Sequence, residues 1–269
     1  MKISLITACY NSEATIRTAI ESVLSQKGVD IEYIIVDGGS TDGTVDIIKE
    51  YSTRSTRLTF KWISEKDSGM YDAINKGIKM ATGDVVGILN ADDVLASDDT
   101  LAHIVSAFNT DSYPLASDSS RIDAVYADIR FVREGETVEA VRKAETVRYC
   151  SAKRWRPWMF RFAAMVPHPS FYVRRECFER LGGYSLDYRI CADFELELRY
   201  LYLAKLKAAY HPECVVVMRM GGMSTSGWRS NLVINREDLR ALRSHGIWSC
   251  LPLIYLKYLF KIWGFVFRR

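Results

Sequence analysis

Acidic and amide side chains recur in this sequence at the points where apolar stretches end. Asn11 follows the first stretch, Asp37 the second, and Asp67 lies soon after the third. The fourth stretch is apolar throughout and is followed by Asn90-Ala91-Asp92-Asp93. Two adjacent carboxylates repel each other unless a cation or hydrogen-bond donors offset their charge. A hard divalent ion, Mg²⁺ or Mn²⁺, commonly completes its shell with water and phosphate oxygens, so the pair predicts a nucleotide diphosphate ligand.

Each of these acids also has a simpler interpretation. A single aspartate after a strand is usually a turn former. Ser97-Asp98-Asp99-Thr100 have a structural explanation of this kind. They precede a segment whose apolar residues have helical spacing, and they can cap that helix and interact favourably with its dipole. The other acids coincide at several strand ends, and ligands in open α/β sheets bind beyond the carboxyl ends of the strands. This coincidence favours a binding site.

The elements that would position these side chains alternate between strand and helix. The predicted strands are 2–11, 31–36, 58–63 and 85–89. The predicted helices are one capped by Ser12 and ended by Gly28, a short one around 45–48, and one over 69–81 closed by Gly83. Apolar strands that alternate with amphipathic helices predict an α/β fold, a Rossmann-like, mostly parallel sheet with helices on both faces.

The second half of the chain has a less regular pattern. The expected elements are a hairpin of 124–132 and 137–141, a strand at 170–173, a helix ending at Gly182-Gly183, a longer helix from near Asp193, and a buried strand at 214–218. Residues 148–162 are basic and aromatic, which suits either a lipid headgroup interface or a solvated loop with some aromatic residues in the core.

Composition excludes several classes of protein. The chain has 269 residues, 48% of them hydrophobic, and 36 Lys+Arg against 33 Asp+Glu leave a net charge of +3. This excludes a disordered chain and argues against a nucleic-acid binder. The six cysteines include no C-x-x-C pair, which argues against a zinc knuckle or a disulfide framework and fits a reducing cytosol.

The C-terminal segment 251–269 holds four basic residues, no acid and a dense set of apolar residues. The longest charge-free run in this region, 244–256, has 13 residues, short of the ~18 expected for a membrane-spanning helix. We therefore predict an amphipathic helix in the plane of a membrane, held by a basic face and anionic lipid. The alternatives are a helix packed on the rest of the chain or on a second subunit.

Seven segments of the chain, taken together and in this order, resemble glycosyltransferase family 2. The segments are Thr7–Asn11, Val36–Thr44, Asp67–Gly77, Asn90–Asp93, His168–Ser170, Leu181–Tyr184 and Ala192–Arg199. The resemblance covers roughly residues 2 to 225. It implies a GT-A fold and an inverting transfer of a sugar from a nucleotide diphosphate sugar, commonly a UDP-sugar, to an acceptor hydroxyl.

The resemblance also implies roles at the donor end. Asp37 would accept an N–H of the nucleobase, with the backbone of Ala8 and the side chain of Tyr10 beside the ring. Asn11, at the same strand end, belongs to this donor-binding set. Asp67 and Lys76 would touch ribose or phosphate, although a solvated helix face explains them nearly as well.

Asn90-Ala91-Asp92 occupies the family's DXD position, with Asp92 as the expected ligand of Mn²⁺ or Mg²⁺ and Asp93 as a neighbouring candidate. Asn90 departs from the more frequent aspartate: its amide can bond ribose but brings no charge. In some relatives a histidine from the stretch around His211 completes the metal site; the alternative for His211 is a plain strand-end residue.

Asp193 matches the family's general base, which takes the proton of the attacking acceptor hydroxyl. Taken alone, Asp193 could equally be a first-turn acid of its helix, and Glu195 and Glu197 are rival bases.

We predict a GT-A catalytic domain over 1–227, with a donor half at 1–110 and an acceptor half at 111–227, followed by a helical, membrane-associating tail at 228–269. The expected location is the cytoplasmic face of the plasma membrane. The expected acceptor is a saccharide, lipid-linked if the tail binds membrane, that is used in surface polysaccharide synthesis. An oligomer is compatible with the sequence. One rival is a sugar nucleotidyltransferase, but Ala8–Ser12 lacks the Gly-rich phosphate loop it needs. A second rival is a non-enzymatic, membrane-recruited binding module.

Overall fold

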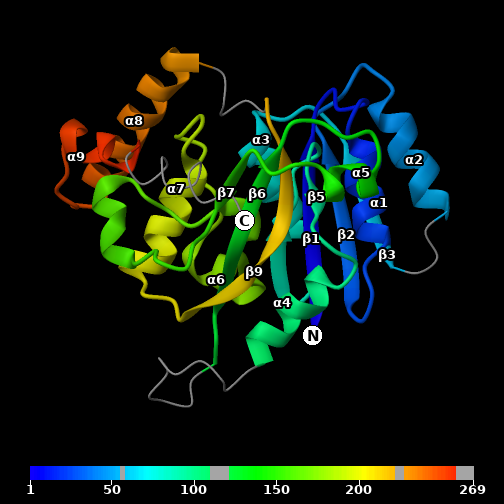
Figure 1. Ribbon diagram of the computed structural model, residues 1–269, viewed down its shortest axis with the longest axis horizontal. Coiled ribbons are helices and arrows are strands. Elements are labelled where there is room, and N and C mark those ends of the chain that lie inside the picture. Colours follow the sequence, from blue (N-terminus) through cyan, green and yellow to red (C-terminus); the bar gives the residue numbers. More distant parts are fainter. Residues whose placement is uncertain (55–57, 110–120, 222–226, 259–269) are drawn as a thin grey trace.

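A single mixed sheet organises the computed structural model, which describes residues 1–54, 58–109, 121–221 and 227–258. The strands of the described residues are β1 (Lys2–Cys9), β2 (Asp30–Asp37), β3 (Thr59–Ser64), β4 (Val85–Ile88), β5 (Val94–Leu95), β6 (Ala124–Val132), β7 (Arg148–Cys150), β8 (Tyr172–Arg174) and β9 (Ala208–Arg219). Their order in the sheet is β3-β2-β1-β4-β8-β6-β9-β5, and β7 pairs with β6 (Figure 1).

Helices surround this sheet. The α-helices of the described residues are α1 (Ile16–Leu24), α2 (Thr44–Arg54), α3 (Met70–Met80), α4 (Thr100–Asn109), α5 (Val138–Lys143), α6 (Arg175–Leu181), α7 (Ala192–Glu197), α8 (Gly227–Ser244) and α9 (Leu251–Tyr255). Two short 3₁₀ helices, η1 (Pro157–Phe162) and η2 (His168–Ser170), lie between β7 and β8, and a π-helical segment, Leu198–Leu203, continues α7.

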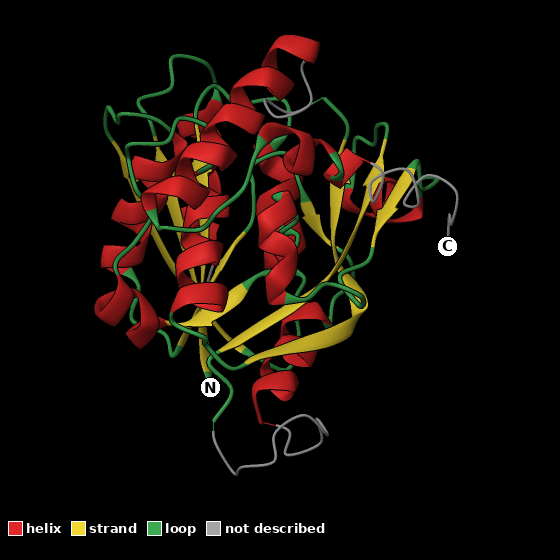
Figure 2. Cartoon of the chain, turned by 90° about the vertical axis from the view of Figure 1, so that its left-hand side faces the viewer, coloured by secondary structure: helices red, strands yellow, loops and turns green. Residues whose placement is uncertain are grey.

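The first half of the sheet is parallel, as the sequence predicts. β1 pairs in parallel with β2 and β4, and β2 pairs in parallel with β3. Successive residues of β1 face opposite sides of the sheet, so Leu5 shares a buried cluster with Ile20 of α1 and Ile6 shares another with Ile74 of α3. Helices therefore cover both faces, as Figure 2 shows, and the predicted α/β fold class is confirmed.

The predicted hairpin strand at 137–141 is wrong. Thr137 is the N-cap of helix α5, and its side chain accepts a hydrogen bond from the backbone N–H of Ala140 at 3.1 Å. Glu139 in the first turn and two basic residues in the last turn also complement the helix dipole. The antiparallel partners of β6 are β7 and β8, and β9 pairs with β6 in parallel.

The predicted cap of the first helix is also wrong. Helix α1 begins at Ile16, after Thr15, and the backbone carbonyl of Ser12 accepts hydrogen bonds from both residues. The backbone N–H of Ser12 donates to the hydroxyl of Thr44 at 2.7 Å. Ser12 thus fixes the loop after β1 against the start of α2. The helix ends at Leu24, ahead of the expected Gly28.

The described part of the predicted tail packs on the rest of the chain. Ala241 and Leu242 of α8 are fully buried in the cluster that also contains residues of α3 and α7. After α9, Lys257 forms an ion pair of 2.6 Å with Asp238 of α8, and both side chains are almost completely buried. No helix in the described ranges is both long enough and apolar enough to cross a bilayer. Residues 259–269, on which part of the tail prediction falls, lie outside the described residues.

Candidate active site

The loops that follow β1 and β2 hold each other in place at the carboxyl edge of the sheet. Asn11 has a positive φ of 48°, and its side-chain oxygen accepts from the backbone N–H of Thr41 at 2.9 Å. The backbone N–H of Asn11 donates to the hydroxyl of Ser40 at 2.8 Å. Tyr10, the preceding residue, is 61% exposed beside this clamp. The structure therefore places Tyr10 and Asn11 at the same edge as Asp37.

Asp37 is completely buried in this edge. Its two oxygens accept hydrogen bonds from the hydroxyls of Ser40 and Ser64 and from the backbone N–H groups of Gly39 and Ser40. Burial alone would raise the pKa of Asp37, but these hydrogen bonds outweigh burial and lower it. A nucleobase N–H can reach this carboxylate only after the Ser40 or Ser64 hydroxyl turns away.

Asp67 and Lys76 lie beside this edge. The carboxylate of Asp67 lies against the turn after β2, whereas the ammonium group of Lys76 forms an ion pair. A Cβ built on Gly38 would lie 2.6 Å from Oδ2 of Asp67, so the glycine is what lets this carboxylate approach the turn after β2. Lys76 of α3 is held by Glu65 at 2.8 Å, and its ammonium group also donates to the carbonyl of Lys66. Lys76 therefore reaches a ligand only by exchanging the partner Glu65.

The acidic pair after β4 is strongly perturbed. Asp93 is fully buried: Oδ2 accepts from the side-chain amide of Asn90 at 2.8 Å, and the buried Oδ1 has no hydrogen-bond partner. Burial raises the pKa of Asp92, and burial together with the charge of Asp92 raises that of Asp93 well above its usual value. An orphaned carboxylate oxygen behind a partly exposed carboxylate fits a divalent cation at Asp92.

Arg219, at the end of β9, lies beside the acidic pair. Its guanidinium donates to the backbone carbonyl of Asp92, to the hydroxyl of Thr18 at 2.9 Å and to the carbonyl of Gly135 at 2.8 Å. Arg219 thus supplies a fixed positive charge next to Asp92. The sequence analysis missed it, because only the pairing of β5 with β9 brings it there.

The predicted role of His211 beside Asp92 is wrong. The end of β9 reaches Asp92 through Arg219, whereas His211 pairs with Ala127 eight positions earlier on the same strand. On the paired strand β6 the same interval runs from Ala127 to Val132, and five strand residues span roughly 17 Å. His211 lies instead next to Glu213, at 3.3 Å. It cannot share a cation with Asp92.

Asp193 lies in the first turn of α7 and is half-buried. Its Oδ1 accepts from the hydroxyl of Tyr71 at 3.1 Å and from the backbone N–H of Phe194 at 2.8 Å. Within the described parts of the chain, no donor is hydrogen-bonded to its other oxygen, Oδ2. One oxygen is thus held in place while the other is available to take a proton.

Neither of the two rival carboxylates on α7 is available: hydrogen bonds occupy Glu195, and Glu197 is buried. Glu195 accepts two hydrogen bonds from Arg199, at 2.9 and 3.0 Å, and one from His245 at 2.8 Å. Glu197 is fully buried, accepts from the backbone N–H of Val166, and burial raises its pKa well above the usual value. Neither can meet an incoming hydroxyl, which leaves Asp193 as the candidate base.

Two further residues position the loop before Asp193, and the sequence analysis missed both. Tyr71 of α3 also donates to the carbonyl of Ile190. Glu237 of α8 accepts from the backbone N–H groups of Arg189, Ile190 and Cys191 at 3.1, 2.9 and 3.1 Å. A carboxylate at the N-terminus of a helix is electrostatically favourable. Helices distant in sequence from α7 therefore fix the backbone that carries the candidate base.

Substituting Glu237 with glutamine is expected to lower kcat about tenfold and leave the KM for the donor unchanged, because a small displacement of a reacting group is costly. The substitution keeps the size of the side chain but removes the charge and one of its acceptor oxygens. Steady-state kinetics measures both parameters. Glu139→Gln, on an exposed surface pair with Lys143, is the matched control and should change neither. A normal kcat in Glu237→Gln would show that Glu237 does not position the base.

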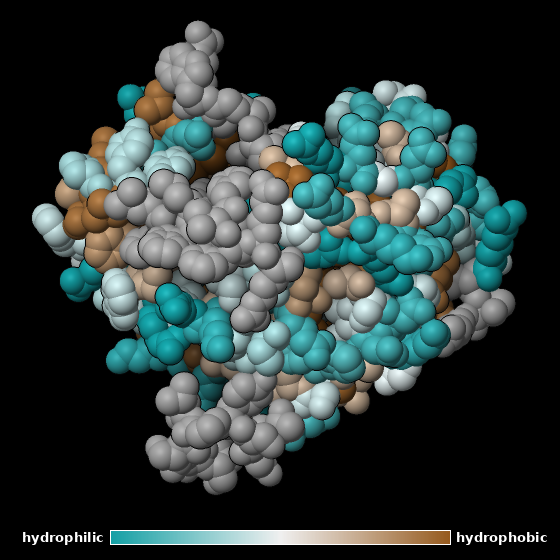
Figure 3. Space-filling model, in the orientation of Figure 1, coloured by the Kyte–Doolittle hydropathy of each residue, from teal (hydrophilic) through white to brown (hydrophobic). Residues whose placement is uncertain are grey.

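The polar residues that follow β1, β2 and β4 lie at the edge where these strands end, at the top of Figure 1, opposite the N-terminus. In the same orientation, Figure 3 shows an indentation of the surface there, between the side that carries α8 and the side that carries α2.

Solved structures share this fold. The S. aureus TarS 1-349 complex with UDP-GlcNAc superposes with a TM-score of 0.62 at 18% identity, covering 90% of this chain and 66% of that chain. The mannosyltransferase PcManGT from Pyrobaculum calidifontis, in complex with GDP-Man and Mn²⁺, gives 0.63 at 21% identity, covering 98% and 72%. This chain spans 40% of the longer TarS chain. The fold is GT-A.

Sequence comparisons give the family. The family model "Glycosyl transferase family 2" matches residues 4–181. A "PGL/p-HBAD biosynthesis glycosyltransferase" of Mycobacterium bovis is 30% identical over 241 residues, which are 89% of this chain and 83% of the relative. The putative glycosyltransferase EpsH of Bacillus subtilis is 40% identical over 96 residues, 36% of this chain and 27% of the relative. The chain belongs to glycosyl transferase family 2 and is a glycosyltransferase, as its motifs predict.

Proposed function

We propose that this glycosyltransferase moves a sugar, with inversion, from a UDP-sugar to a hydroxyl of a lipid-linked saccharide in surface polysaccharide or glycolipid synthesis. The observation that carries the proposal is the state of Asp193: Tyr71 holds Oδ1, and no donor among the described residues is hydrogen-bonded to Oδ2. The solved neighbours support a nucleotide sugar donor, because their titles name UDP-GlcNAc and GDP-Man. The mycobacterial relative's name, "PGL/p-HBAD biosynthesis glycosyltransferase", supports a biosynthetic role.

In this mechanism Oδ2 of Asp193 takes the proton of the acceptor hydroxyl as its oxygen attacks the anomeric carbon. The bond from that carbon to the diphosphate oxygen breaks on the opposite face, so the configuration inverts in one displacement. The leaving nucleoside diphosphate carries the electron pair away, and the fixed charge of Arg219 favours its negative charge nearby. When bound at Asp92, with Asp93 behind it, Mn²⁺ or Mg²⁺ supplies further positive charge for the diphosphate.

The donor residues keep the roles proposed from the motifs. The backbone of Ala8 and the exposed ring of Tyr10 flank the nucleobase, beside Asn11. Asp37 accepts a base N–H once a serine hydroxyl turns away, and Asp67, Lys76 and Asn90 face ribose or phosphate.

A thermal-shift screen of nucleotide sugars, with and without Mn²⁺, tests the donor. A UDP-sugar at about 100 times its Kd should raise Tm by roughly 5 °C or more with Mn²⁺, because ligand binding stabilises the folded state. A larger shift with GDP-sugars would correct the nucleotide. Stabilisation by a nucleoside triphosphate together with turnover of a sugar phosphate would favour the nucleotidyltransferase, and no shift with any nucleotide sugar would favour a non-enzymatic module.

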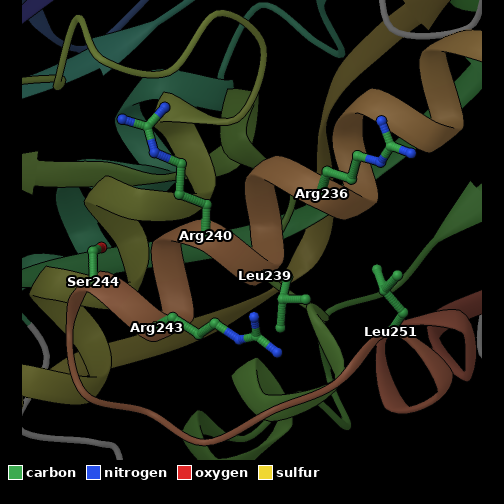
Figure 4. Close-up of a pocket in the computed structure, with 6 residues that line it drawn as sticks. All are labelled: Arg236, Leu239, Arg240, Arg243, Ser244 and Leu251. Carbon is green, nitrogen blue, oxygen red and sulfur yellow. The ribbon is translucent and has the colours of Figure 1, made fainter.

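We also propose that the face formed by α8 and α9 rests on an anionic membrane. A groove of about 460 Å³ lies there, lined by Arg236, Leu239, Arg240, Arg243, Ser244 and Leu251 (Figure 4). Among the described residues, no acidic side chain pairs with Arg236 or Arg243. Trp248, in the segment between α8 and α9, is 72% exposed, and Figure 3 shows apolar surface on this side of the molecule. Cations and exposed apolar residues together suit a lipid interface.

Vesicle sedimentation tests this membrane face with the full chain. Substituting both Arg236 and Arg243 with glutamine should weaken binding to phosphatidylglycerol-containing vesicles by about 30-fold, since each basic residue contributes about 1 kcal/mol at an anionic surface. Arg121→Gln, remote from α8 and paired with Glu176, is the control and should bind like the unmodified protein. Equal binding by the double variant, or equal binding to neutral vesicles, would contradict the membrane proposal.

A further inference from the structure

A second group of potential metal ligands lies at the end of β9 away from the candidate active site. His211 and Glu213 belong to β9, and His103 belongs to α4, which packs beside this strand (Figure 1). One ligand atom from each of the three residues lies within 4.8 Å of the other two. Within the described ranges, this is the one group of three or more His, Cys, Asp or Glu residues with that property.

The backbone of β9 explains why these side chains meet. The pairing of β9 with β6 runs from His211 opposite Ala127 directly to Cys214 opposite Asp128, so Pro212 and Glu213 form an irregularity in the strand. Alternate residues of a strand face the same side, and such bulges redirect side chains, commonly next to functional sites. His211 and Glu213 both turn toward α4, where His103 completes the group.

The distances suit a small divalent ion. Nε2 of His211 lies 3.3 Å from Oε2 of Glu213, which matches the roughly 3.3 Å between ligands of a tetrahedral zinc ion at 2.0–2.1 Å. Nδ1 of His103 lies 2.8 Å from the same Oε2, a hydrogen bond that an ion would replace by releasing its proton. Nε2 of His211 is buried and has no hydrogen-bond partner in the part of the chain that the structure describes, so it is a ligand atom that already faces the group.

Burial differs among the three residues in a way that leaves one side open. The side chain of His211 is 12% exposed, whereas those of His103 and Glu213 are 47% and 53% exposed. A carboxylate and an inward-facing imidazole are thus combined with access from solvent for the ion and for a fourth, water ligand.

We propose that His103, His211 and Glu213 form a binding site for Zn²⁺ that is separate from Asp92 and ties α4 to β9. Two imidazoles and a carboxylate are a ligand set that zinc takes with a water in the fourth position. Imidazole ligands favour Zn²⁺ over Mg²⁺ and Mn²⁺, whereas a carboxylate such as that of Asp92 is a ligand that suits Mg²⁺ and Mn²⁺. The two sites therefore differ in the ion they select.

Calorimetric titration of the chelator-treated full chain with Zn²⁺, in millimolar Mg²⁺, tests this site. One equivalent should bind, and His103→Ala and Glu213→Gln should each weaken that binding by about 100-fold or more. Even the loss of a residue that only hydrogen-bonds to a metal ligand typically lowers metal affinity by about 10–100-fold. His245→Ala is the matched control: His245 also contacts a glutamate, Glu195 at 2.8 Å, but lacks a third ligand. Its zinc binding should equal that of the unmodified chain.

A second measurement distinguishes this site from the candidate active site. Co²⁺ used in place of Zn²⁺ should give the visible absorption of a four-coordinate ion, and the Asp92→Asn variant should keep it while His103→Ala loses it. His103 and Glu213 are exposed, so circular dichroism should show both variants folded. No zinc bound by the unmodified chain, or equal zinc affinity in His103→Ala and Glu213→Gln, would overturn the proposal. Loss of the cobalt signal in Asp92→Asn would assign the ion to the other site.

Discussion

An Asp193→Asn variant is expected to bind the nucleotide sugar as well as the unmodified chain and to transfer the sugar roughly 10²–10⁴ times more slowly, the range typical of a lost general base. Asparagine can still accept the hydrogen bond from Tyr71 and preserves the shape of the first turn of α7. It cannot take the proton of the acceptor. Transfer measured with radiolabelled donor, together with the donor Kd, separates the two effects.

Asp187→Asn is the control for this experiment, because Asp187 is an exposed acid just before the same loop. It should leave transfer unchanged. Turnover by Asp193→Asn within a few-fold of normal would exclude Asp193 as the base. Glu195 would then need to change partners, and the fully buried Glu197 would need to become accessible, before either could act.

The second large effect is expected at the acidic pair after β4. Asp92→Asn should weaken Mn²⁺-dependent donor binding by about 10–100-fold and reduce transfer in proportion, since it removes the partly exposed carboxylate proposed to hold the cation. Binding measured without metal should be unchanged. Isothermal titration with a UDP-sugar, with Mn²⁺ and with chelator, measures this difference. Donor binding that depends on Mn²⁺ equally in Asp92→Asn and the unmodified chain would place the cation elsewhere.

Asp93→Asn separates the cost of the buried charge from metal binding. Among the described residues the buried Oδ1 of Asp93 has no hydrogen-bond partner, whereas Oδ2 accepts from the amide of Asn90. Removing the charge should leave Tm in chelator equal or higher, because burying a charge without a partner is costly. Asp92→Asn, partly exposed, should change Tm in chelator little. A Tm several degrees lower in Asp93→Asn would contradict this account of the pair.

The sequence predicts the sheet and its carboxylates well for a physical reason. Strands buried on both faces must be continuously apolar, and polar residues can resume only where the strand leaves the core. Asn11, Asp37 and the Asp92-Asp93 pair therefore mark the same edge of the sheet. This part of the prediction depends on local pattern alone.

The predictions that the structure contradicts, and the residues that were not predicted, depend on pairing between distant segments. Spacing along the chain cannot tell which end of β9 lies near Asp92, so His211 was assigned to the wrong end and Arg219 was missed. Glu237 lies 44 residues after Asp193, and no local motif links the two. The predicted strand at 137–141 takes no account of Thr137 as the N-cap of the helix at 138–143.

The hydrogen bonds that Glu237 accepts from the backbone of residues 189–191 affect where this enzyme can be divided. The family match ends at residue 181, ahead of both the candidate base and the helix that secures its backbone. A protein shortened to the matched residues 4–181 would retain strands β1 to β4. It would lose both the candidate base and α8, whose Glu237 holds the loop before that base. Chimaeras built from two relatives should therefore exchange residues 189–258 as one unit, so that the loop, α8 and the buried Lys257–Asp238 pair come from the same parent.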